Sequence, residues 1–440
     1  MTISHAAPPL HRTALPRLLP PAPADLRAHV ELHGPLPSAN GLVAALRDAG
    51  LSGRGGAAFP VHRKLEAVAE AGLRTGRTPV VVANGCEGEP ASGKDAMLLR
   101  LAPHLVLDGL RLAAEAVGAD RAGTTYLAVE RGSGLRAVLE SALAERGQGR
   151  GQERGQEPGQ HQVTLVEVPP RFLSGESSAL TGFISGRPAL PRFPQPPPRE
   201  RGVGGAPTLV QNVESLAQLA LVARHGAAWF RAVGTPAEPG TMLCTLHDAW
   251  SGPRVMEAAT GTPLRRLFGL APQGSPQAPV QAVLVGGYHG SWLPAAALDA
   301  RLSAADLGVP LGAGVLAALP ADRCGLVETA RVLRYLALES AGQCGPCLNG
   351  LPRIAAACTE LARPEAATRR PGLLADLARW SGLVQGRGAC HHPDGTVRLL
   401  RSALTVFAAE AQAHVAGFCR AADATPLLPV PAEAPQEGAA

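Results

Sequence analysis

The hydrophobic and polar positions in the first half of the chain alternate between two patterns. Short apolar runs rich in β-branched residues predict buried strands at 78–83, 124–129 and 163–168. Apolar residues at helical spacing predict helices at 38–49, 61–71, 98–117 and 134–144. This alternation of strands and helices is typical of an α/β fold.

The second half of the chain changes character twice. Short β-type runs at 241–246 and 280–285, with a helix at 263–268 between them, predict a small β-rich domain. From about residue 327 helical periodicity dominates, which predicts a separate helical domain. The stretch 145–162 is low in complexity and rich in Gly, Gln, Arg and Glu, so we expect a disordered insertion there.

Composition narrows the function classes. With 440 residues, 46% of them hydrophobic, the chain is globular and long enough for several domains. Its net charge of +5 is mild and no basic cluster carries interleaved aromatics, so we expect no nucleic-acid partner. No apolar run reaches membrane-spanning length and no export signal is recognisable. We expect a cytoplasmic protein without direct membrane insertion, whose eight cysteines are thiols or metal ligands.

Residues 53–60, which read Gly-Arg-Gly-Gly-Ala-Ala-Phe-Pro, form the first candidate site. The glycines allow a tight turn that brings backbone N–H groups close to an anion. A helix beginning at Val61 would add the positive end of its dipole, and Arg54 and Lys64 would add charge. The loop therefore predicts a phosphate site, with a plain Gly-rich turn as the alternative. It is neither a Walker A loop nor a GxGxxG fingerprint.

Polar residues follow the first predicted strand. Residues 84–90 read Asn-Gly-Cys-Glu-Gly-Glu-Pro, and open α/β sheets bind ligands at the carboxyl ends of their strands. Asn84, Glu87 and Glu89 are therefore candidates for ligand contacts. A solvated acidic turn is the alternative interpretation.

Cys344 and Cys347 form a CxxC pair, which places two thiolates on one tight turn, and Cys390 is a candidate third ligand. A redox dithiol, a zinc site and an iron–sulfur site all fit this spacing. Four other cysteines lie in apolar runs and are expected to be small buried residues: Cys244, Cys324, Cys358 and Cys419. The sequence assigns no role to Cys86, which lies in the acidic turn.

Several motifs in the same order resemble the NADH-binding flavoprotein subunit of respiratory complex I and related subunits of NAD-linked hydrogenases and formate dehydrogenases. The similarity runs over about residues 51–407. The family's Gly-Arg-Gly-Gly-Ala-Gly-Phe-Pro loop and following lysine match 53–60 and Lys64. Four further family motifs match in order. Residues 84–95 match Asn-x-x-Glu-x-Glu-Pro-Gly-x-x-Lys-Asp, and residues 175–180 match Gly-Glu-Glu-Thr-Ala-Leu. Residues 207–215 match Pro-Thr-x-Val-Asn-Asn-Val-Glu-Thr, and residues 339–347 match Glu-Ser-Cys-Gly-x-Cys-x-x-Cys.

The resemblance implies FMN, NAD(H) and an iron–sulfur cluster as cofactors, and a smaller iron–sulfur or ferredoxin-like subunit as partner. It implies an FMN-binding α/β domain, a β-grasp-like (SLBB-type) domain and a C-terminal helical bundle that carries the cluster. The expected divisions are a Pro-rich lead-in at 1–37, the α/β domain at 38–235, the β-grasp-like domain at 236–320, the helical domain at 321–425 and a tail at 426–440.

The resemblance also assigns roles to residues. Phe59 and Glu89 are expected beside the nicotinamide, Phe59 by stacking, with Glu89 as the catalytic candidate. The full set of implied cofactor-binding residues is Gly53, Arg54, Gly55, Gly56, Ala57, Phe59, Lys64, Asn84, Glu87, Glu89, Gly175, Glu176, Ser177, Gln211 and Asn212. The implied metal ligands are Cys344, Cys347 and Cys390.

The chain departs from the family at both cofactor sites. Ala341 stands where the family has its first cluster cysteine, so three thiolates remain. Either a further residue supplies a fourth ligand to a [4Fe–4S] cluster, or three cysteines hold a [3Fe–4S] cluster, or the cluster is lost. The fourth-ligand candidates are Ser340, His391, His392 and Cys358. The positions that differ around the flavin and nicotinamide are Ala58, Cys86, Phe172, Ser177 and Gln211.

Three functions follow from these motifs. The first is an NADH dehydrogenase-like oxidoreductase that passes electrons from a nicotinamide nucleotide through FMN to an iron–sulfur cluster and a partner protein. The second keeps FMN and the cluster but exchanges electrons with ferredoxin-like partners instead of NADH. The third is a degenerate, non-catalytic paralogue that serves as an interaction module.

Overall fold

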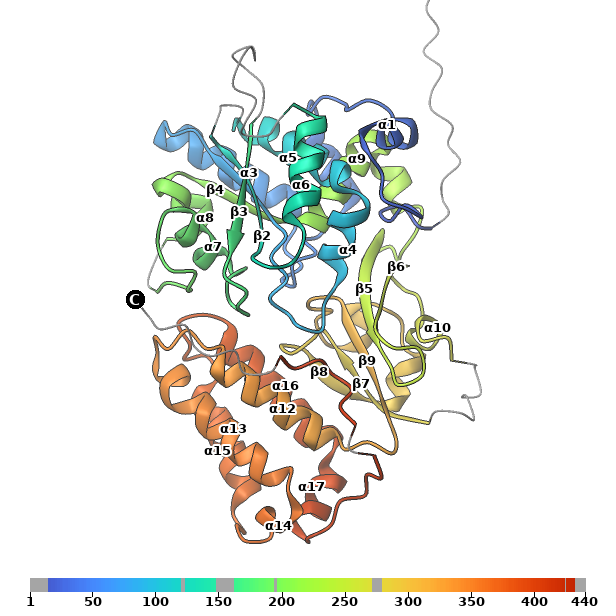
Figure 1. Cartoon of the computed structure of the whole chain (residues 1–440), viewed down its shortest axis with the longest axis vertical. Helices are drawn as coiled ribbons and strands as arrows, with labels where there is room; N and C mark the ends of the chain where they lie inside the picture. The colour runs from blue at the N-terminus through green and yellow to red at the C-terminus, as the bar shows by residue number, and fades with distance from the viewer. Residues whose placement is uncertain are drawn as a thin grey trace, which may run out of the picture.

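The protein is described by a computed structural model that covers residues 15–119, 123–147, 162–193, 196–270, 279–423 and 425–431. Figure 1 shows an α/β region in blue and green, a β-rich region in yellow and a helical region in orange and red. The predicted disordered insertion lies for the most part outside the described residues, as do 1–14 of the lead-in and 432–440 of the tail.

A four-stranded parallel sheet is the centre of the α/β region. Its strands are β1 (Val80–Asn84), β2 (Thr125–Glu130), β3 (Val163–Val168) and β4 (Thr208–Asn212). Their order across the sheet is β3-β2-β1-β4, so the chain builds outward from β1 in one direction and then returns to place β4 on its other side. Adjacent parallel strands whose connections diverge in this way form a topological switch point.

Both faces of this sheet are buried, which explains the uninterrupted apolar runs of its strands. Val81 and Ala83 join the larger core, and Val80 and Val82 join a smaller one on the opposite face. The larger core includes α2 (Leu42–Ala49), α3 (Val61–Thr75), α4 (Lys94–Leu101), α5 (Pro103–Val117), α6 (Arg136–Glu145) and α9 (Val213–Arg231). The smaller core includes α7 (Ser177–Ile184) and η1 (Val203–Gly205), next to α8 (Pro198–Arg201).

The described part of the Pro-rich lead-in is packed against the rest of the chain. It contains a helix, α1 (Leu26–His33), which begins after the capping side chain of Asp25. The backbone N–H groups of Arg17 and Leu18 donate to the buried Glu257 carboxylate at 2.6 and 2.8 Å. A helix and buried hydrogen bonds therefore hold the described part of the lead-in in place.

A second, mixed sheet forms the β-rich region. Its order is β6-β5-β9-β7-β8, in which β5 and β9 are parallel and the other neighbours are antiparallel. The strands are β5 (Thr241–His247), β6 (Arg254–Ala259), β7 (Val280–Val285), β8 (Ser291–Pro294) and β9 (Val315–Pro320). The short helices are α10 (Leu264–Leu267), η2 (Ala295–Asp299) and α11 (Ala304–Leu307).

The second sheet joins two cores because its strands alternate their side chains between two faces. Val283 and Leu316 lie in the core of the β-rich region itself, whereas Leu284 and Ala317 lie in the core of the helical region. The helices there are α12 (Gly325–Leu338), α13 (Leu351–Leu361), α14 (Pro364–Ala367), α15 (Leu373–Val384), α16 (His392–Val406) and α17 (Ala408–Val415). A mixed α/β architecture with a parallel sheet and a helical C-terminal region is therefore confirmed.

The described end of the chain packs back onto the helical region. The N–H groups of Leu427 and Leu428 donate to Glu328, and Leu428 is buried. Among the described helices, none has the length and apolar character that crossing a membrane requires.

Candidate functional site

The Gly-rich loop closes on itself and leads directly into α3. The N–H of Gly53 donates to the carbonyl of Phe59 at 2.9 Å, and Ser52 and Pro60 form an isolated bridge. Gly56 adopts a φ of 100°, which favours glycine. Ala58 adopts a φ of 49° although it carries a Cβ, so the alanine that replaces the family's glycine sits in the left-handed region.

The loop lies at the switch point of the parallel sheet. A Cβ on Gly55 would approach the Cβ of Asn212, the last residue of β4, to 3.2 Å. The N–H of Arg54 donates to Ser215 Oγ at 2.8 Å, in the first turn of α9. Asn212 is in register with Asn84 at the end of β1. The loop predicted from its glycines therefore lies at the place where open parallel sheets bind ligands.

Within the described residues, two cations at this loop form no ion pair, although Glu214 and Glu238 act on Arg54 from a distance in the direction that raises its pKa. The Nζ of Lys64 has one weak contact, to the carbonyl of Val210 at 3.5 Å, and burial lowers its pKa. The Nε of Arg54 is buried without a hydrogen-bond partner, and burial lowers the pKa of this residue too. Within the described residues no carboxylate lies within 4.0 Å of either side chain. Both side chains are partly buried, and a partly buried cation without an ion-pair partner is unfavourable, so this arrangement suits an anionic ligand.

Buried acceptors without partners lie in the same region. The described residues offer no hydrogen bond to Oε1 of Gln211 or Oε1 of Glu130, which lie near the carboxyl ends of β4 and β2. Burial, together with the carboxylates of Glu87 and Glu339, raises the pKa of Glu130 to about 7. The Oγ of the buried Ser174 is also unpaired. The sequence analysis missed Glu130 and Ser174, although the position of Glu130 at the end of a predicted strand was a usable signal.

The loop after β1 packs against the segment before α7. Asn84 Nδ2 donates to the carbonyl of Gly175 at 2.8 Å, and a Cβ on Gly175 would lie 3.2 Å from the Cβ of Cys86. Glu176 caps α7 by accepting from the N–H groups of Ser178 and Ala179 at 2.9 and 3.0 Å. Ser177 is the first residue of that helix. The structure therefore brings the residues of the second and third motifs together.

Glu87 and Asn212 take part in a buried polar network that supports the site. Glu87 accepts from the N–H groups of Asp95 and Ala96 at 3.0 Å each, which caps α4. Asn212 Nδ2 donates to Asp95 at 2.7 Å, and Lys94 pairs with Asp95 and Glu214 at 2.7 and 2.9 Å. Burial alone would lower the pKa of Lys94, but these carboxylates raise it above its usual value. The network fixes the ends of β1 and β4 relative to each other.

Glu89 faces the β-rich region. Its Oε2 accepts from the N–H of Tyr288 at 2.8 Å, and its Oε1 accepts weakly from Ala91 at 3.4 Å. The pKa of Glu89 is raised to about 8, because burial and the nearby Glu87 outweigh the lowering by the two N–H groups. The ring of Phe59 is 45% exposed, and Gly56 adjoins Gly312. The β-rich region therefore contacts Glu89 through Tyr288 and the Gly-rich loop through Gly312.

The three predicted metal ligands come together at the start of the helical region. The Sγ atoms of Cys344 and Cys347 are 3.5 Å apart, and Cys347 lies in a π-helical turn, η3 (Pro346–Gly350). Cys390 interacts electrostatically with both thiols and with Glu176, the cap of α7. Three thiols gathered in this way fit an iron–sulfur cluster with three cysteine ligands.

The side chains considered as a fourth ligand are not equally available. Both ring nitrogens of His392 are engaged, Nδ1 with His289 at 3.1 Å and Nε2 with the carbonyl of Leu336 at 2.7 Å. Cys358 is buried and interacts with Cys324 instead. The expectation that Cys419 is a small buried residue is wrong, because Cys419 is exposed. Cys244, Cys324 and Cys358 are buried, as expected.

Comparison with known proteins adds to this geometry. Residues 46–221 match a family described as the Nuo51 FMN-binding domain, and residues 328–414 match the NADH-ubiquinone oxidoreductase-F iron-sulfur binding region. An F subunit of NADH-quinone oxidoreductase in Rhizobium meliloti (strain 1021), the one numbered 2, is 30% identical over 382 residues. The aligned residues cover 85% of this chain and 88% of the relative. The chain belongs to the family of NADH-quinone oxidoreductase F subunits.

Another F subunit and a solved structure extend the likeness. The F subunit of NADH-quinone oxidoreductase in Escherichia coli (strain K12) is 30% identical over 383 residues, which cover 85% of this chain and 84% of the relative. The crystal structure of an NAD+-reducing [NiFe]-hydrogenase in the H2-reduced state aligns with a TM-score of 0.74 at 28% identity. That alignment covers 89% of this chain and 65% of the hydrogenase chain. The resemblance drawn from the motifs is thus confirmed.

Proposed function

We propose that this chain takes electrons from a nicotinamide nucleotide through FMN and passes them to an iron–sulfur cluster and a partner subunit. The observation that carries the proposal is the set of unpartnered polar groups at the switch point, within the stretch that matches an FMN-binding domain. FMN supplies the chemistry when bound, because it accepts a hydride as an electron pair and releases the electrons singly.

The residues of the Gly-rich loop fit an FMN phosphate. The tight turn, the unpartnered Nε of Arg54 and the nearly unpartnered Nζ of Lys64 offer donors and positive charge to an anion. In this proposal, Asn84, Gly175 and Asn212 shape the flavin pocket, while Gln211 and Glu130 supply its unpaired acceptors. Glu87 acts through α4 by holding the strand end in position.

Phe59 and Glu89 are our candidates for the nicotinamide side. The exposed ring of Phe59 offers a stacking surface. The carboxyl of Glu89 changes protonation near neutral pH, so it would hold or release a proton at Oε1 while Oε2 accepts from Tyr288. Ala58 and Ser177 differ from the family at this side, which makes the choice of electron donor the part of the proposal most in need of a test.

The iron–sulfur centre in this proposal is held by Cys344, Cys347 and Cys390. The interaction of Cys390 with Glu176 supports a short path between the two cofactors, because Glu176 belongs to the proposed flavin pocket. Leu348, next to Cys347, is 62% exposed and offers an apolar contact to a partner. We propose a smaller iron–sulfur or ferredoxin-like subunit as that partner.

The domain divisions belong to the proposal as well. An FMN domain at 38–235, an SLBB-type β-grasp-like domain at 236–320 and a helical bundle at 321–425 are supported by the separate cores of the three regions. The mixed five-stranded order of the second sheet supports a small β-grasp-like unit.

The test is anaerobic purification, followed by flavin and iron analysis and addition of NADH. Bound FMN whose absorbance bleaches on NADH supports the proposal, and about three irons per chain supports a three-cysteine cluster. FMN that responds to reduced ferredoxin but not to NADH or NADPH would reassign the electron donor. Protein that binds neither flavin nor iron on reconstitution would overturn the function and favour the non-catalytic alternative.

A further inference from the structure

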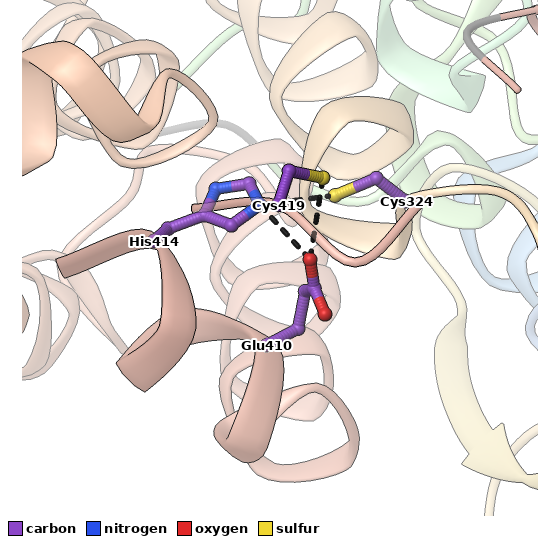
Figure 2. Close-up of side chains that lie close together, drawn as sticks. All are labelled: Cys324, Glu410, His414 and Cys419. Carbon is purple, nitrogen blue, oxygen red and sulfur yellow. Dashed lines mark hydrogen bonds and ion pairs between the residues drawn. The ribbon is translucent and has the colours of Figure 1, made fainter. Parts of the chain in front are cut away.

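Four metal-ligating side chains gather at the far end of the helical region, apart from the three cluster cysteines. They are Cys324, Glu410, His414 and Cys419, and one ligand atom from each lies within 4.8 Å of all the others. Figure 2 shows the four side chains converging from the start of α12, from α17 and from the turn that follows it. None of the motifs or matched functions described above uses this group.

Local structure explains why the four groups meet. Glu410 and His414 are four residues apart on α17, so they share one face of that helix. Gly417, with a φ of 96°, turns the chain after α17 so that Cys419 returns to Glu410. Cys324 is the residue that precedes α12, and Gly325 beside it is packed so tightly on Phe407 that a Cβ there would meet the ring at 2.2 Å.

Three of the separations lie close to the edges of a coordination tetrahedron. Zinc bonds of about 2.0–2.3 Å place neighbouring ligand atoms about 3.3–3.8 Å apart. Cys324 Sγ lies 3.6 Å from His414 Nε2, and Cys419 Sγ lies 3.3 Å from Glu410 Oε1. His414 Nε2 lies 3.0 Å from Glu410 Oε1.

The surroundings orient these atoms as ligands. His414 Nδ1 lies 2.8 Å from the carbonyl of Leu361, and a ring that donates from Nδ1 keeps Nε2 free to bind a metal. The N–H groups of Leu326 and Val327 donate to Cys324 Sγ, and the N–H of Ala421 donates to Cys419 Sγ. The N–H of Arg420 donates to Glu410 Oε1 at 3.0 Å. Backbone donors to sulfur and a carbonyl behind the histidine are typical of the outer shell of metal sites.

We propose that Cys324, Glu410, His414 and Cys419 bind one zinc ion as a structural site. Two thiolates, an imidazole and a carboxylate form a tetrahedral ligand set that zinc prefers over hard cations such as magnesium or calcium. Four protein ligands complete the coordination shell, so the site has no open position for catalysis. The ion would tie the start of α12 to the end of α17, two segments 95 residues apart in the chain (419 minus 324).

The test measures zinc per chain in protein purified without oxygen from zinc-supplemented cells. All samples carry Cys344→Ser and Cys347→Ser, because these thiols form a separate place for zinc. In this background Cys419→Ser removes one proposed ligand at an exposed position. Cys358→Ala is the matched control, because Cys358 interacts with Cys324 but lies outside the four-residue group.

We expect about one zinc per chain in the background protein and in Cys358→Ala. In Cys419→Ser the zinc content per chain should fall by at least about tenfold. If a variant does not fold, cobalt substitution of the background protein decides, because two thiolate ligands give intense charge-transfer absorption with visible bands of tetrahedral cobalt. The proposal would be overturned if the background protein held almost no zinc, or if Cys419→Ser held as much zinc as the background protein. Octahedral cobalt bands, or a Cys324–Cys419 disulfide found by peptide mapping, would also overturn it.

Discussion

Two groups of buried charge lie in the same α/β region and differ in how they are partnered. Asp108, on α5, accepts from His29 Nε2 and Arg146 Nη1 at 2.7 Å each and from Arg224. Burial alone would raise the pKa of Asp108, but these partners hold it below its usual value. At the switch point, by contrast, Lys64 and Arg54 form no ion pair with a carboxylate among the described residues, although Glu214 and Glu238 act from a distance to raise the pKa of Arg54 against the lowering by burial.

The contrast separates a structural role from a binding role. A buried carboxylate that has its cations joins elements of the fold, here α1, α5 and α9. A buried cation without an anion destabilises the free protein, and it persists where a ligand supplies the missing charge. The same physical rule assigns Asp108 to folding and supports the proposal that Lys64 contributes to flavin binding.

The largest effect is expected from breaking the partnered group. Asp108→Ala leaves three cationic or polar partners buried without their acceptor, so the free energy of unfolding should fall by about 3–5 kcal/mol. Urea unfolding followed by circular dichroism measures it. Glu31→Gln, which removes an exposed pair with Arg27, is the control and should change stability by less than about 1 kcal/mol. A loss of less than about 1 kcal/mol in the free energy of unfolding of Asp108→Ala would contradict the structural role of Asp108.

The next effect concerns the unpartnered group. Lys64→Met should weaken FMN binding about 10- to 100-fold, because one charge-assisted contact to an anion is lost. The stability of the flavin-free protein should stay the same or rise, since a partly buried charge without an ion-pair partner disappears. Quenching of FMN fluorescence gives the affinity and thermal melting gives the stability. Arg63→Met, an exposed neighbour on α3, is the control. Unchanged FMN affinity in Lys64→Met would remove it from the site.

A third prediction extends the comparison to a carboxyl group without a cation. The raised pKa of Glu89, about 8 against an ordinary 4.5, means that the folded state keeps a proton that the unfolded state has lost. Stability should therefore fall as pH rises through this window, by at most about 1.4 kcal/mol per pH unit from this group. Glu89→Gln should flatten that slope in urea titrations from pH 5 to 8. Glu70→Gln, at an exposed position of α3, should leave it unchanged. Equal slopes in Glu89→Gln and the unaltered protein would contradict the assignment.

The smallest effect tests strain in the loop that carries the unpartnered cations. Ala58 has a positive φ, so Ala58→Gly should stabilise the protein by about 0.5–1 kcal/mol once the greater freedom of glycine in the unfolded chain is counted. Ala57, whose φ is not positive, offers the matched control, and Ala57→Gly should destabilise by a similar amount. If Ala58→Gly and Ala57→Gly both destabilised the protein, Ala58 would not be strained in the loop.

Sequence pattern predicted the parts of the fold that depend on local order. The run 163–168 became β3 with the same bounds, and 280–285 became β7, because both are short apolar segments between turn residues. The strand β4 was not predicted, because residues 208–212 run directly into α9 and carry the motif residues Gln211 and Asn212. Its place beside β1 is a non-local pairing, and that pairing creates the switch point.

The candidate site shows the same division. The loop at 53–60 and the Cys344–Cys347 pair were predicted from spacing, since each is a local motif, and Cys390 was only a candidate third ligand until the family resemblance implied the full set. Glu130, Ser174 and the zinc-type group were missed because their meaning depends on neighbours distant in sequence. Cys324 and His414 are 90 residues apart, and no local pattern joins them. Burial without a partner is likewise a property of the folded chain.

The hydrogen bonds that position Glu89 set an order of assembly for a chain that is synthesised from its N-terminus. Its carboxylate accepts from Tyr288, and the hydroxyl of Tyr288 donates to the carbonyl of Pro429. The Gly-rich loop and β1 leave the ribosome long before either partner exists. A nascent chain can therefore form the phosphate cradle early, whereas the nicotinamide side matures only after the strap at 425–431 has been synthesised and has docked. Flavin capture during translation would precede competence for electron transfer.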